Sequence, residues 1–290
     1  MNLTSEITSA PPLSDSQRAA LISLLADEDP AVYQTIWSKL LSYGPDVVTW
    51  LQPYLLDSDP LLRRRSQAIV DHFGRQSADT DFLGFCLRQG EEFDLESGVW
   101  KLVKTEFPNF NEQAYRALLD GYANELKRRV SLDGGAETIV AHINEFLFSE
   151  LGFRGNEEDY YDPDNSYLNR VLDNRLGNPI SLSLVYIWIA RRMHLPVAGI
   201  GLPGHFICRF QTSKEELYID AFNSGKLLTK VDCVKYLLQT SHTLEEGHLA
   251  PISARRVLLR ICANLHQIYT ALEQAEHVSR FQRYLVALAK

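Results

Sequence analysis

The fold of this chain is decided by residues 177–211, which read GNPISLSLVYIWIARRMHLPVAGIGLPGHFICRFQ. Asn178 can cap a helix, and Pro179 suits the first helical position, where the N–H that proline lacks would have no partner. Apolar residues then recur at helical spacing, which predicts a helix over 179–194 with one apolar stripe packed on a core. After Pro196 the period changes to that of strands.

The strand period predicts three strands, over residues 197–202, 205–211 and 216–220, with a polar turn at 212–214. A long helix followed by a small antiparallel sheet is typical of an α+β fold. The rest of the chain is mostly helical in pattern, so the sequence predicts a mostly helical α+β protein.

The N-terminal part has helical periodicity and a short repeated motif. The motif LADEDP at residues 25–30 recurs as LLDSDP at 55–60, an offset of 30 residues, and a helix is expected after each copy, over 31–42 and 61–73. Stacked helix pairs of this kind are typical of HEAT-like repeats. An ordinary helical bundle that reuses an Asp-Pro turn is the alternative.

Three regions are predicted from these patterns: a HEAT-like helical region over residues 1–90, the α+β core over 91–245, and two C-terminal helices over 246–290 that meet near residues 274–276. Within the core, Asn165 or Ser166 is expected to cap a short helix.

Composition and charge limit the partners. The chain has 290 residues, 37 of them acidic and 29 basic, with a net charge of −8. Phosphate binding needs a field of Lys and Arg, so nucleic acid is not the expected partner. The basic clusters at residues 63–65, 127–129, 191–192 and 255–256 lie in predicted helices, and we expect them to be solvated helix faces.

The cysteines and the N-terminus indicate a cytoplasmic protein. The four cysteines are far apart and form no C-x-x-C motif, which favours reduced thiols. Residues 1–5 lack the basic and apolar regions of a signal peptide. The most apolar run, residues 180–190, is far shorter than the roughly 20 residues that span a bilayer, so no membrane partner is expected.

Four motifs in sequence carry a family resemblance. They are DPDNSYLN at 162–169, GNPISL at 177–182, LPGHF at 202–206 and IDAFN at 219–223. In this order the chain resembles the SirB-one family within the transglutaminase-like superfamily, from about residue 91 to the end. Members of that family end in tetratricopeptide-like helices, so the resemblance implies such helices over 246–290, where about one repeat fits.

The resemblance also implies a catalytic arrangement. In active transglutaminase-like enzymes a Cys begins the long helix, a His lies on the next strand and an Asp on the strand after it. A thiolate at a helix N-terminus is stabilised by free N–H groups, which can also hold an oxyanion. His205 and Asp220 match the second and third members, but the nucleophile position falls on Pro179, which carries no attacking group. The alternative to a site is that His205 and Asp220 form a structural hydrogen-bonded pair on a half-buried sheet.

Two kinds of side chain could replace the missing nucleophile. Ser183 lies four residues after Pro179, about 40° around the helix, and could face His205, whereas Ser181 should point away. Cys208 lies on the strand of His205 but on its opposite face, since the two are three residues apart.

We therefore expect a non-catalytic protein that binds or regulates a protein partner, with His205, Asp220 and Ser183 as remnants of a site. The cleft around His205, Asp220, Asn223 and Tyr186 is the expected contact region. The alternative is a hydrolase or acyltransferase that uses Ser183 or a thiol with His205 and Asp220, and a third possibility is acid–base chemistry on a small molecule without a covalent step. No cofactor is expected.

No metal site is expected either. The distant His194, His242 and His248 show no metal-ligand spacing with His205 and Asp220.

Overall fold

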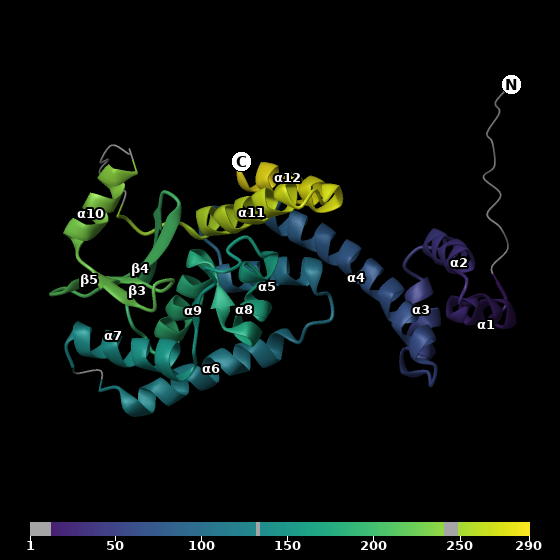
Figure 1. Ribbon diagram of the computed structural model, residues 1–290, viewed down its shortest axis with the longest axis horizontal. Helices are drawn as coiled ribbons and strands as arrows, with labels where there is room; N and C mark the ends of the chain where they lie inside the picture. Colours follow the sequence, from purple (N-terminus) through teal and green to yellow (C-terminus); the bar gives the residue numbers. More distant parts are fainter. Residues whose placement is uncertain (1–12, 132–133, 241–248) are drawn as a thin grey trace, which may run out of the picture. The chain divides into compact units, whose positions relative to one another are not determined.

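The computed structural model describes residues 13–131, 134–240 and 249–290 (Figure 1). The chain is α+β with helices predominating, as predicted. It divides into two compact units, Met1–Ser77 and Ala78–Lys290, and helix α4 (Pro60–Arg88) contributes residues to both. The region boundaries expected near residues 90 and 245 stay predictions.

The first unit consists of short helices around a core of its own. Leu25, Leu40 and Leu51 are fully buried in this core. The helix expected over 31–42 is confirmed, while the one expected over 61–73 continues to Arg88. Besides the first part of α4, the unit contains α1 (Asp15–Ser23), α2 (Pro30–Ser42), α3 (Val47–Leu51) and the 3-10 turns η1 (Leu24–Ala26) and η2 (Gln52–Leu56).

The two Asp-Pro motifs build the same helix start. Asp29 Oδ1 accepts a hydrogen bond from the amide of Ala31 at 2.8 Å, and Asp59 Oδ1 accepts one from the amide of Leu61 at 2.8 Å. Each aspartate thus caps the helix whose first residue is the following proline. The repeated Asp-Pro motif therefore forms the same helix start twice. The interpretation of this repeat as HEAT-like stays a prediction.

The second unit contains most of the helices around one large core. They are the last part of α4, α5 (Leu95–Glu106), α6 (Glu112–Arg129), α7 (Ala136–Asn144), which continues as the π-helical segment η3 (Glu145–Glu150), the 3-10 turn η4 (Pro163–Asn165), α8 (Leu168–Asn174), α9 (Pro179–Arg192), α10 (Lys230–Gln239), α11 (Ala254–Ala271) and α12 (Ala275–Leu288). The two predicted C-terminal helices are α11 and α12, and their apolar faces belong to this same core.

The sheet of the second unit is an antiparallel meander in the order β3-β4-β5-β6. Its strands are β3 (Val197–Leu202), β4 (His205–Gln211), β5 (Glu216–Asp220) and β6 (Lys226–Leu228). The first three coincide with the predicted strands. The sequence did not predict β6 or the short parallel pair β1 (Arg154–Gly155) and β2 (Leu176–Gly177), since two or three residues show no usable alternation.

Helix α9 lies at the centre of this core. Every residue from Pro179 to Ala190 is buried, and the helix packs against α6, β3 and β4. The prediction of a single apolar stripe is therefore wrong. Side chains outside that stripe, such as Leu184 and Trp188, are also covered, because the helix is enclosed by the sheet on one side and by helices on others.

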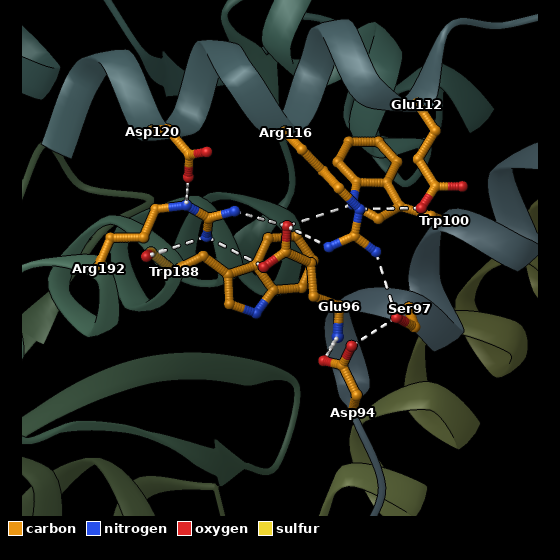
Figure 2. Close-up of polar contacts among 9 residues, drawn as sticks. All are labelled: Asp94, Glu96, Ser97, Trp100, Glu112, Arg116, Asp120, Trp188 and Arg192. Carbon is orange, nitrogen blue, oxygen red and sulfur yellow. Dashed lines mark hydrogen bonds and ion pairs between the residues drawn. The ribbon is translucent and has the colours of Figure 1, made fainter. Parts of the chain in front are cut away.

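An ion-pair network fixes the C-terminal end of α9. Figure 2 shows Arg192 reaching Glu96 of α5 and Asp120 of α6. Arg192 Nη2 lies 2.8 Å from Glu96 Oε1, its Nε lies 2.5 Å from Asp120 Oδ1, and Arg116 of α6 approaches Glu96 at 3.1 Å. A cation in the last helical turn also interacts favourably with the helix dipole. The network therefore ties the C-terminal end of α9 to α5 and α6.

The prediction that the basic clusters are solvated faces is wrong for Arg255, which is 7% exposed. Its guanidinium donates to backbone carbonyls at the ends of two helices. The acceptors are Cys86 and Gln89 at the end of α4 and Ala287 and Leu288 at the end of α12. Carbonyls in the last turn of a helix lack intrahelical partners, so a buried arginine can satisfy several of them at once.

Candidate functional site

A histidine and an aspartate meet at the ends of two neighbouring strands. His205 opens β4 directly after the turn at Gly204, whose φ of +65° is the left-handed conformation that favours glycine. Asp220 ends β5 directly after Ile219, which pairs with Cys208 of β4. Cys208 lies three residues from His205 and Ile219 one residue from Asp220, so His205 and Asp220 share the face opposite to that pair. His205 Nε2 lies 2.8 Å from Asp220 Oδ2, as the sequence implied.

Asn223 completes this polar group. Its side-chain amide donates to Asp220 Oδ2 at 2.8 Å, and its backbone amide donates to Asp220 Oδ1 at 3.2 Å. Burial opposes ionisation of Asp220, but the hydrogen bonds from His205 and Asn223 and the charge of a protonated His205 outweigh it, so the pKa of Asp220 is lowered. The carboxylate is therefore ionised at neutral pH and holds the imidazole by Nε2, while Nδ1 has no hydrogen bond within the described residues.

The N-terminus of α9 follows the sequence prediction. Asn178 is the N-cap and Pro179 the first helical residue. Asn178 Oδ1 accepts hydrogen bonds from the amides of Ile180 at 3.0 Å and Ser181 at 2.9 Å. Since Pro179 has no N–H, the first three residues of the helix offer no free amide donor.

The segment before α8 anchors this cap instead of capping α8. The expectation that Asn165 or Ser166 caps the short helix is wrong, because α8 has Tyr167 as its N-cap and no side-chain cap. The hydroxyl of Ser166 accepts a hydrogen bond from the side-chain amide of Asn178 at 2.9 Å. The backbone carbonyl of Asn165 accepts one from the Ser181 hydroxyl at 2.7 Å. Ser181 is therefore held on the side of Asn165, in keeping with the expectation that it points away from His205.

One cleft brings the predicted residues together. It has a volume of about 520 Å³, and Pro179, His205, Asp220 and Asn223 all line it. Its remaining walls come from Tyr160, Leu202, Phe222, Lys226, Leu228, Asp232, Cys233, Lys235, Tyr236 and Gln239. The helix start and the strand ends thus face a common space, as the resemblance implied.

Several of these residues were missed by sequence reasoning. Phe222 and Tyr236 flank the His205 ring, with ring centroids 6.3 and 6.1 Å away. Lys226 and Lys235 belong to β6 and α10, two elements the sequence did not resolve in detail. Of the missed residues, Phe222 lay within the quoted motif IDAFN and Leu202 within LPGHF, and these motifs could have drawn attention to them.

Ser183 and Tyr186 do not line the cleft. The Ser183 side chain is fully buried, and its hydroxyl donates to the carbonyl of Phe206 at 3.4 Å. Tyr186 is also fully buried in the core around α9. The expectation that Tyr186 borders the cleft is therefore wrong, since the helix is covered on that side too.

All four cysteines are buried and unpaired. Burial raises the pKa of Cys208 to about 12 and the pKa of Cys233 to about 11. Cys208 points to the helix side of the sheet, where its thiol lies 3.6 Å from the carbonyl of Ser183. Cys233 alone contributes to the cleft, and at neutral pH its thiol stays protonated and therefore weakly nucleophilic.

Within residues 13–131, 134–240 and 249–290, no group of three or more His, Cys, Asp or Glu side chains is placed to hold a metal ion. His242 and His248, considered above as ligands, lie outside these residues, as do residues 1–5. In the same described ranges, no helix has the length and apolarity needed to cross a bilayer.

Comparison with known proteins identifies the class. A family profile described as Transglutaminase-like superfamily matches residues 113–263, which include α9, the sheet and the cleft residues. The chain therefore belongs to the transglutaminase-like superfamily. No solved structure matches it.

Within this superfamily the chain belongs with the UPF0162 proteins. It is 33% identical to the UPF0162 protein of Xylella fastidiosa (strain Temecula1 / ATCC 700964) over 200 residues, which are 66% of this chain and 70% of that protein. A UPF0162 protein of Pseudomonas aeruginosa is 32% identical over 193 residues, 64% of this chain and 68% of its own. F-box only protein 21 of Mus musculus is 37% identical over 135 residues, which are 44% of this chain and 21% of that protein.

Proposed function

We propose that this chain is a non-catalytic transglutaminase-like protein whose cleft binds a protein partner. One observation carries the proposal: at the helix start that faces His205, Pro179 offers neither an attacking group nor an amide donor. The next two amides are already bonded to Asn178. Acyl transfer needs both a nucleophile and donors for the oxyanion, so the substitution of one residue removes parts of both.

The alternative of a hydrolase or acyltransferase has less support. Ser183 would have to leave a buried position and break its contact with Phe206 to reach the imidazole. Cys233 lines the cleft, but a thiol whose pKa is about 11 is a poor nucleophile at neutral pH. The retained His205–Asp220–Asn223 group then serves to shape and polarise a binding surface.

The finer family and architectural assignments belong to the same proposal. The order of the four motifs supports membership of the SirB-one type. The repeated Asp-Pro caps support HEAT-like helices in the first unit, and the α11–α12 hairpin supports a tetratricopeptide-like element. In F-box only protein 21 the matched segment is about a fifth of a longer protein, which supports its use as a module. Four unpaired thiols support a cytoplasmic location.

Active-site-directed labelling tests the proposal. The full-length protein is incubated with a fluorophosphonate probe for activated serines and a vinyl sulfone probe for activated thiols. We expect no labelling that depends on His205, with His277→Ala as a matched control on α12 and unfolded protein as a control for thiol reactivity. Stoichiometric labelling of the folded wild type that is abolished by His205→Ala would overturn the non-catalytic assignment.

A further inference from the structure

The turn that carries Asn223 is held by a residue from outside the cleft. Residues 221–225 connect β5 to β6, and within them Asn223 bonds the carboxylate of Asp220 through its backbone and side-chain amides. The side chain of Asn144, the last residue of α7, donates a hydrogen bond from Nδ2 to the backbone carbonyl of Gly225 at 2.7 Å. The turn is therefore attached to a helix that lies 81 residues away in the sequence.

Asn144 and Gly225 also pack closely against each other. A Cβ atom on Gly225 would collide with the side-chain amide of Asn144, so no side chain fits at this position. Gly225 has a φ of +74° and Ser224 before it a φ of +53°, so the turn uses two successive left-handed residues. The amide of Gly225 donates to the carbonyl of Asp220 at 2.9 Å and closes the turn. Asn144 thus fixes the end of a turn that starts at Asp220.

Three local irregularities meet at this contact. Ser224 is a left-handed residue other than glycine, a conformation that is unfavourable and clusters at functional sites. The buried Oδ1 of Asn144 has no hydrogen-bond partner among the described residues, which lowers stability. Directly after Asn144 the helix becomes π-helical over Glu145–Glu150, and π-helical segments are rare and frequently found at functional sites. These departures from a relaxed structure favour a role for Asn144 beyond stability.

We propose that Asn144 is a positioning residue for the polar group of the cleft. Through Gly225 it fixes the turn that places Asn223 on the carboxylate of Asp220. The carboxylate in turn holds the imidazole of His205 by Nε2 at 2.8 Å. Asn144 does not line the cleft, so it acts on the polar group without touching a bound molecule. It has this role whether the cleft binds a protein or takes part in a reaction.

Hydrogen exchange measured by NMR on the full-length protein tests this role. In Asn144→Leu, a side chain of similar volume replaces the amide, and no charge changes. We expect the backbone amides of Asn223 and Gly225 to exchange about tenfold faster than in the wild type, because the lost hydrogen bond lets the turn open more often. The imidazole proton that His205 donates to Asp220 should exchange faster by a similar factor, while the backbone amides of β4 stay unchanged.

Asn169→Leu is the matched control, because the Oδ1 of Asn169 in α8 is likewise buried without a hydrogen-bond partner among the described residues. We expect this variant to leave the exchange of the turn amides and of the imidazole proton as in the wild type. Exchange in Asn144→Leu that is unchanged at the turn, that rises equally across β4 and the turn, or that is matched in Asn169→Leu would overturn the positioning role.

Gly225→Ala gives a second test that does not depend on the folding of Asn144→Leu. Its added methyl group separates the turn from the Asn144 amide, so the imidazole proton of His205 should again exchange faster. A folded Gly225→Ala in which this proton exchanges as in the wild type would also contradict the proposal. The electrophile labelling described above decides the non-catalytic assignment independently.

Discussion

The two sides of the cleft differ in how their polar groups are used. On the helix side, Asn178 bonds the amides of Ile180 and Ser181, and Pro179 has none to offer. On the strand side, His205 is held by Asp220, and its Nδ1 makes no hydrogen bond within the described residues. The helix side is closed by its own hydrogen bonds, while the strand side still has groups that can bind something.

This difference between the two sides bears on whether the cleft meets the requirements of acyl transfer. A transglutaminase-like site needs a nucleophile and oxyanion donors from the helix, and it needs an oriented imidazole from the strands. Here the helix contribution has become structural, but the imidazole remains oriented by a buried carboxylate. In the proposed function, this oriented pair is part of the surface that contacts the partner.

The largest effect is expected on the closed side, for Asn178→Ala. The variant loses a helix cap and leaves the Ser166 hydroxyl and two amides without their partner in a buried place. A cap contributes about 1 kcal/mol and buried unpaired groups cost about 1–3 kcal/mol, so we expect the free energy of unfolding to fall by about 2–4 kcal/mol. Urea unfolding followed by circular dichroism measures it.

Asn111→Ala is the matched control, because Asn111 caps α6 through one bond to Ala114 at an exposed helix start. We expect a loss of only about 1 kcal/mol there. Equal losses in the two variants would show that the helix start at Asn178 is an ordinary cap and would remove the contrast between the two sides.

Asp220→Asn tests the strand side of the cleft. At neutral pH it should lower the free energy of unfolding by about 1–3 kcal/mol, since a buried charged hydrogen-bond acceptor is lost. The pKa of Asp220 is lowered by folding, so its carboxylate stabilises the fold above the unfolded value of about 3.9 and this contribution is lost as the pH falls through the folded pKa. We therefore expect the wild type to lose more stability than the variant between about pH 5 and pH 3.

The control for this titration is Asp15→Asn, because the Asp15 side chain is 99% exposed. Its stability profile should parallel that of the wild type. A profile of Asp220→Asn that also parallels the wild type would contradict an ionised Asp220 that is stabilised by its neighbours.

The smallest effect is expected for Ser183→Ala. Its hydroxyl makes one long bond of 3.4 Å to a carbonyl, so the free energy of unfolding should change by less than about 1 kcal/mol. Ser66→Ala is the comparison, since the buried Ser66 hydroxyl has no partner among the described residues and its removal should be neutral or stabilising. A loss above about 2 kcal/mol for Ser183→Ala would show a stronger role for that hydroxyl than its geometry indicates.

Much of the fold could be predicted because its signals are local. The Asn178–Pro179 start, the turn at Gly204 and the alternation of β3 to β5 are each contained in a few residues. The enclosure of α9 could not be predicted, because the side chains that cover it come from distant segments. Arg255 was misjudged for the same reason, as its acceptors lie 32 to 169 residues away.

The central residues of the cleft were predicted from the sequence, but the lysines that line its edge were not. His205, Asp220 and Pro179 stand in motifs that the resemblance assigned to one site, and the structure places all three in one cleft. Lys226 and Lys235 carry no motif, and they reach the cleft only because β6 returns beside β5 and α10 follows it. Tyr186 shows the opposite error, since helical spacing alone cannot tell a cleft wall from a core.

The most direct test places a thiol at position 179. In Pro179→Cys, the helix start and His205 should lower the thiol pKa below its usual value of about 8.5, and His205→Ala added to this variant should raise it again. The pH dependence of alkylation by iodoacetamide measures both, with the wild type as the background for the four buried cysteines. A thiol pKa at or above 8.5 that does not respond to His205→Ala would contradict the claim that Pro179 occupies the position of the lost nucleophile.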